Sequence, residues 1–129
     1  MFGIVLFAHG SRDPAWAQPF ARTAASAQAR LPDALVTCAY LEHMRPSLEE
    51  AVLGLAARGA TRIRVVPLFL GMGGHLRKDF PALMESIQAK LPGVAFERAP
   101  SLAEAPEVLD AIAGWVATSV GDPKAKRDS

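Results

Sequence analysis

Short apolar runs alternate with longer segments of helical periodicity along most of this chain. Four of the runs have the length and aliphatic content of strands, namely Phe2–Ala8, Leu35–Leu41, Arg62–Leu70 and Val94–Arg98. Strands that alternate with helices form βα units, and such units assemble into a parallel sheet. With right-handed crossovers, the pattern predicts an α/β fold with an open four-stranded parallel sheet in the order 2-1-3-4 and helices on both faces, a short flavodoxin-like arrangement.

The first two helices have recognisable boundaries. Asp13 and Pro14 provide a cap and a first-turn proline for a helix that we expect to continue to about Arg30. Ser47 and Glu50 have the spacing of a capping box, which predicts the start of a second helix that ends at Gly59.

Two further helices are predicted in the second half of the chain. A loop over residues 71–78 precedes a helix that we expect to begin at Asp79–Phe80–Pro81 and to end near Leu91. The last helix spans about Glu104–Ser119. It is expected to bury four apolar side chains at helical spacing, Val108, Ile112, Trp115 and Val116.

Composition limits the classes of protein to which the chain can belong. Its 129 residues are 50% apolar, which fits one domain, predicted here as residues 1–120 with a disordered tail over 121–129. A net charge of +1 gives no overall attraction to nucleic acid or to an anionic membrane. The lone Cys38 and an apolar N-terminal run that lacks a basic segment lead us to expect a cytoplasmic location.

Two of the predicted strands lead into a histidine beside glycine. His9 precedes Gly10 after the first strand, and His75 follows Gly74 after the third. In the predicted strand order the topological switch point lies between these strands, so both imidazoles should reach the crevice where ligands bind. Glu42 follows the neighbouring second strand and should project from the same edge. Two imidazoles and a carboxylate suit divalent Fe, Co, Ni or Zn, and neutral imidazole is also a base, so spacing alone leaves metal binding and proton transfer both open.

Three ordered blocks of residues resemble the sirohydrochlorin chelatase family, whose members insert cobalt or iron in cobalamin or siroheme synthesis. The blocks are Ala8–Pro14, then Ala39–Glu42 with Pro46–Leu48, and then Val66–Leu70 with Gly74–Pro81. The resemblance extends to about Val120, and with a single domain the chain resembles the short form of the family.

This resemblance implies a class II chelatase that inserts a divalent metal into sirohydrochlorin or a similar polycarboxylated tetrapyrrole without a nucleotide. Cobalt and iron are the expected metals, with nickel as a further candidate. The metal-binding histidines of the family correspond to His9 and His75, which we expect to hold the ion and accept pyrrole protons, and the associated glutamate corresponds to Glu42. The short form implies a homodimer. His43 departs from the family pattern, and its role stays open.

A polycarboxylated substrate requires hydrogen-bond donors, and arginine can bind a carboxylate through two parallel bonds. The predicted strand ends carry several candidate donors for the tetrapyrrole. They are Ser11, Arg12, Arg45, Gly74, Arg77 and Lys78.

Two other classes of function fit parts of the same pattern. A non-catalytic carrier of metal or tetrapyrrole would use the same crevice without turnover. A phosphatase that forms a phosphohistidine fits less well, because such enzymes have arginine immediately before the histidine, where this chain has Ala8. The sequence does not choose the metal or the exact macrocycle.

Overall fold

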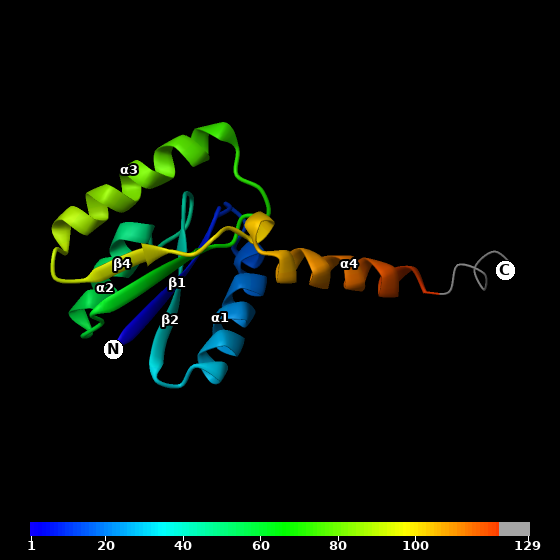
Figure 1. Ribbon diagram of the computed structural model, residues 1–129, viewed down its shortest axis with the longest axis horizontal. Helices are drawn as coiled ribbons and strands as arrows, with labels where there is room; N and C mark the ends of the chain where they lie inside the picture. Colours follow the sequence, from blue (N-terminus) through cyan, green and yellow to red (C-terminus); the bar gives the residue numbers. More distant parts are fainter. Residues whose placement is uncertain (122–129) are drawn as a thin grey trace, which may run out of the picture.

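The computed structural model describes residues 1–121 and contains one parallel sheet (Figure 1). Its strands are β1 (Phe2–Ala8), β2 (Ala34–Tyr40), β3 (Arg62–Pro67) and β4 (Ala95–Arg98). They pair in the order β2-β1-β3-β4, which confirms the predicted topology. Beyond Gly121, the tail predicted to be disordered lies outside the described residues.

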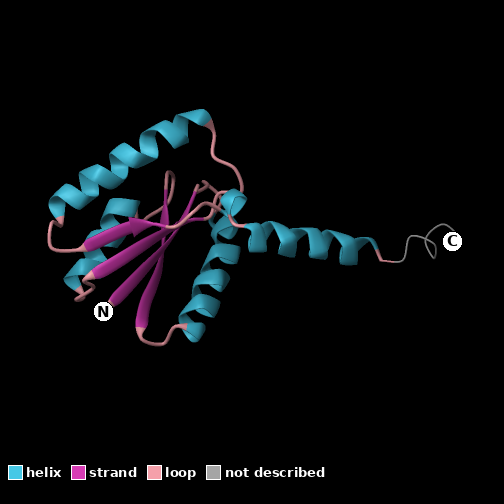
Figure 2. Ribbon diagram, in the orientation of Figure 1, coloured by secondary structure: helices cyan, strands magenta, loops and turns pink. Residues whose placement is uncertain are grey.

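Helices cover both faces of this sheet, as predicted (Figure 2). They are α1 (Gln18–Arg30), α2 (Leu48–Ala57), α3 (Gly74–Lys90) and α4 (Pro106–Val120), with short 3₁₀ turns η1 (Pro14–Ala17) and η2 (Leu102–Glu104) before α1 and α4. The first helix lies on one face, whereas α2 and α3 lie on the other. None of the helices in the described part of the chain is long and apolar enough to cross a membrane.

The larger core lies between the sheet and the pair α2 and α3. Phe7 is fully buried at the centre of this core, and its ring meets those of Phe69 and Phe80 edge-on, with centroids 5.5 and 5.4 Å away. Such edge-to-face pairs add to the free energy gained by burying the rings. Because Phe80 lies on α3, these contacts hold the first half of that helix against β1.

The predictions for the third strand and third helix are wrong at their boundary. β3 ends at Pro67, three residues before the predicted end, and α3 begins at Gly74 and not at Asp79. Proline favours the first turn of a helix, but here Pro81 lies inside α3, where burial of Phe80 and Ile87 fixes the helix on the sheet. The early start places the His75 region on a helix and not in the predicted loop.

The prediction that the last helix buries its apolar face is also wrong. No residue of α4 is buried, and the side chain of Trp115 is 71% exposed. The helix adjoins η2 and otherwise projects away from the sheet (Figure 1). Helical periodicity shows that one face of a helix is apolar, but it does not show which surface covers that face.

The loops that follow β1 and β2 lie in direct contact. Backbone N–H groups of Leu41 and Glu42 donate to the carbonyls of Ala8 and His9 at 2.9 and 3.1 Å. Gly10 adopts φ +98°, and a Cβ at this position would stand 1.9 Å from the carbonyl oxygen of Glu42. Only glycine allows this approach, which sets the distance between the two loops.

Replacing Gly10 by alanine should therefore both strain the backbone and push the two loops apart. We expect Gly10→Ala to lower the free energy of unfolding by about 2–3 kcal/mol, measured by urea denaturation. Gly93→Ala is the matched control, because a Cβ at Gly93 meets no atom within 4 Å. Equal losses in the two variants would show that the contact between the loops is unimportant.

Candidate functional site

Polar side chains gather at the carboxyl edge of the sheet, where β1 and β2 end and α3 begins. His9 follows β1, Glu42 follows β2, and His75 lies in the first turn of α3. All three line one cavity of about 580 Å³, together with Asp79 and Phe69. The structure thus brings the three predicted metal ligands to one cavity, at the edge where ligands bind in open α/β sheets.

Glu42 lies between two histidines at this edge. Its Oε1 is 3.2 Å from Nε2 of His9 and 3.6 Å from Nε2 of His43. His43 has φ 65°, a left-handed conformation that is uncommon for a residue other than glycine. The side chain that the sequence left without a role therefore adjoins the glutamate in the structure.

His75 has a carboxylate neighbour of its own. Its Nε2 is 3.0 Å from Oδ2 of Asp79, one helical turn later on α3. The His75 side chain is 96% exposed, so its ring is open to an incoming ligand. Asp79 was not predicted as a site residue, because the helix was expected to begin there. The spacing of four residues between His75 and Asp79 brings the two side chains together only when both lie on one helix.

The donors therefore form two groups, one on the loops after β1 and β2 and the other on α3. Among residues 1–121, no three histidine, cysteine or acidic side chains stand close enough to hold one metal ion together. A neutral imidazole that donates its Nε2–H to a carboxylate keeps a free lone pair on Nδ1. In His9 and His75 a carboxylate lies beside Nε2, so Nδ1 of each ring can be offered to a metal ion or a proton.

Arg45, one of the predicted carboxylate donors, is occupied elsewhere. Its guanidinium pairs with Glu50, which completes the capping box of α2 with Ser47. The bond from Arg45, and then that from the Ser47 backbone, lower the pKa of Glu50 to about 2. Arg45 does not line the histidine cavity.

The other predicted donors are dispersed around this edge. The hydroxyl of Ser11 accepts a hydrogen bond from the backbone of Asp13 at 3.1 Å. Arg12, Gly74 and Lys78 do not line the histidine cavity. Arg77 lines an adjacent cavity that also contains Arg98, the last residue of β4. Arg98 was missed, although its place at the end of a strand next to β3 was a usable signal.

Comparison with known proteins identifies the family and the fold of this chain. The model of the CbiX family matches residues 3–118. The sirohydrochlorin cobaltochelatase of Methanosarcina acetivorans is 35% identical over 82 residues, which cover 64% of this chain and 63% of that protein. The match thus spans less than two thirds of the length of this curated relative.

Two solved structures have the same fold. A protein from Marinobacter aquaeolei VT8, described as a cobalamin biosynthesis CbiX protein, superposes with a TM-score of 0.80 at 35% identity, over 93% of this chain and 98% of that chain. SirB from Bacillus subtilis, in a structure with Fe³⁺, superposes with a TM-score of 0.78 at 25% identity, over 95% of this chain and 48% of that chain. Since the family model matches nearly all of the described sheet and helices, the chain belongs to the CbiX family.

Proposed function

We propose that this protein is a class II chelatase that inserts cobalt or iron into sirohydrochlorin or a similar polycarboxylated tetrapyrrole. The observation that carries the proposal is the cavity lined by His9, Glu42 and His75 in a member of the CbiX family. A cobaltochelatase relative and a SirB structure with Fe³⁺ support these two metals. Nickel has the same ligand preferences and is a third candidate. Insertion is proposed to need no nucleotide and to occur in the cytoplasm, within one domain of residues 1–120.

The two groups of donors suit transfer of the metal better than its storage. Insertion of a divalent ion releases two protons from the pyrrole nitrogens, so the reaction needs bases as well as metal ligands. In the proposed mechanism, Glu42 and Asp79 orient His9 and His75, whose Nδ1 atoms first bind the ion weakly. Once the ion has moved to the macrocycle, the freed Nδ1 lone pairs accept the two pyrrole protons. Exposed donors on separate elements favour weak binding, which allows the metal to leave for the macrocycle.

The same protein is proposed to act as a homodimer. This chain matches about half of the SirB chain, so a second copy would supply the equivalent of the remaining half. The α4 helix offers a surface for that second copy. Its exposed large apolar side chains recur at helical spacing: Leu109, Ile112, Trp115, Val116 and Val120.

Substitution of either histidine should abolish most of the catalysis. Purified protein mixed anaerobically with sirohydrochlorin and Co²⁺ or Fe²⁺, without nucleotide, should metallate the tetrapyrrole faster than the uncatalysed reaction, followed by absorbance. We expect His9→Ala and His75→Ala each to lower the rate by about a hundredfold, because each removes a base and a ligand.

Asp33→Asn is a suitable control, since Asp33 is exposed at the opposite edge of the sheet, before β2. Tight binding of the tetrapyrrole without any acceleration of metallation would instead indicate a carrier. Full activity in both histidine variants would refute the proposed mechanism.

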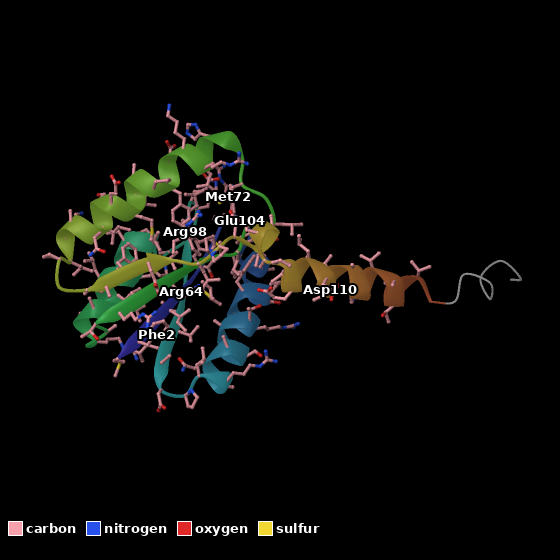
Figure 3. The ribbon with its side chains drawn as sticks, in the orientation of Figure 1. Phe2, Arg64, Met72, Arg98, Glu104 and Asp110 are labelled. Carbon is pink, nitrogen blue, oxygen red and sulfur yellow. The ribbon has the colours of Figure 1, made fainter. Side chains whose placement is uncertain are left out.

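Substitution on α4 should separate the dimer. Trp115→Glu places a charge within the exposed apolar row, so we expect a monomer by size-exclusion chromatography with light scattering where the unmodified protein is a dimer. Asp110 lies on the same helix (Figure 3) but is not one of the exposed apolar residues, so Asp110→Asn should leave the dimer intact. A monomeric unmodified protein, or a dimeric Trp115→Glu variant, would contradict the proposal.

A further inference from the structure

A second cavity of about 430 Å³ lies beside the histidine cavity, and Gly71 lines both. Residues of three elements form its walls. Arg77 comes from α3, Arg98 from the end of β4, and Glu104 from η2. Figure 3 shows Met72, Arg98 and Glu104 side by side where these segments meet.

Arg98 is available to bind an anion. Among the described residues, no carboxylate lies within 4.0 Å of its guanidinium. The guanidinium carbon is 5.6 Å from the centroid of the Phe80 ring, and Phe80 is itself buried in the core. Stacking on a fixed ring restricts the side chain before a ligand arrives, so less entropy is lost on binding.

Arg77 adds a second positive charge to the same cavity. One guanidinium nitrogen, Nη2, donates to the carbonyl of Met72 at 3.1 Å, which draws the side chain back over the loop before α3. The other N–H groups of Arg77 remain to bind a ligand, because guanidinium has five donors. Arg77 also lies in the first turn of α3, where the helix dipole favours an anion.

Glu104 contributes a negative charge to the same cavity. Its Oε1 accepts a hydrogen bond of 3.1 Å from the hydroxyl of buried Ser101, so the carboxylate is held at the cavity wall. It forms no ion pair with Arg77 or Arg98 in the described structure. The cavity thus has two arginines and one carboxylate, a net positive charge in a protein whose total is +1.

We propose that this cavity, defined by Arg77, Arg98 and Glu104, binds one peripheral carboxylate of the tetrapyrrole while the ring faces the histidine cavity. The inference rests on the proposed function, because it assumes that the ligand is a polycarboxylated macrocycle. Arg98 and Arg77 donate to the carboxylate, and Glu104 repels it and so weakens its binding. Since Gly71 lines both cavities, a side group of a ring in one cavity can reach into the other.

The opposed charges allow a test with two variants of opposite effect. Binding of metal-free sirohydrochlorin is measured directly by absorbance titration. We expect Arg98→Gln to weaken binding about tenfold, since it removes a charged hydrogen-bond donor, and Glu104→Gln to tighten it about threefold, since it removes a like charge but keeps the acceptor for Ser101. In metal insertion assays the same changes should alter KM and leave kcat nearly unchanged.

Two controls isolate the carboxylate. Arg30→Gln removes an exposed arginine from the far end of α1 and should leave binding unchanged. The methyl ester of sirohydrochlorin carries no negative charge, so Arg98→Gln should bind it as well as the unmodified protein does. Should Arg98→Gln fail to fold, as judged by circular dichroism, the tighter binding expected of Glu104→Gln still tests the cavity.

The outcomes separate this inference from the proposed function. An unmodified protein that neither binds sirohydrochlorin nor metallates it would refute the proposed function. An unmodified protein that does both, with Glu104→Gln binding no more tightly and folded Arg98→Gln binding within twofold of normal, would refute the carboxylate cavity alone.

Discussion

The parallel pairing of β1 with β2 on one side and β3 on the other determines where every candidate functional group lies. In this register Ala8 is opposite Tyr40, and Phe7 is opposite Pro67, so the three strands end within a residue or two of one another. The loops that follow therefore leave the sheet at a common edge. Gly10 then allows the first two loops to touch, which brings His9 within 3.2 Å of Glu42. Strand pairing, more than any single side chain, creates the cavity.

The site at this edge combines tightly packed aromatic rings with exposed polar side chains. Phe69 and Phe80 pack on buried Phe7, and they form a rigid floor beneath His9 and Arg98. The His9 and His75 side chains are 56% and 96% exposed, and each lies beside a carboxylate. A rigid floor with accessible donors supports the proposed transfer of an ion to a large flat ligand. An enclosed set of ligands would hold the ion too firmly for transfer.

Much of this arrangement could be predicted from local patterns. The apolar runs predicted β1 and the strand order, and the spacing of Ser47 and Glu50 predicted the start of α2. His9, Glu42 and His75 were predicted to share one edge because parallel strands end together. The start of α3 was misplaced because Pro81 is a strong local signal for a helix start, whereas contacts with distant residues fix this helix. Asp79 and Arg98 were missed because their significance depends on neighbours that are remote in the sequence or that require the correct start of the helix.

The α4 helix separates what local spacing specifies from what tertiary packing decides. Its apolar spacing is a property of neighbouring residues, so the sequence specifies both the helix and its apolar face. Burial of that face depends on a second surface, and in the structure the helix projects from the sheet with Trp115 exposed. The cavities show the same division. The order of the strands and the residue types at their ends follow from short-range spacing and strand pairing. The distances between His9 and Glu42, or between Arg98 and Phe80, arise from long-range packing that no local pattern encodes.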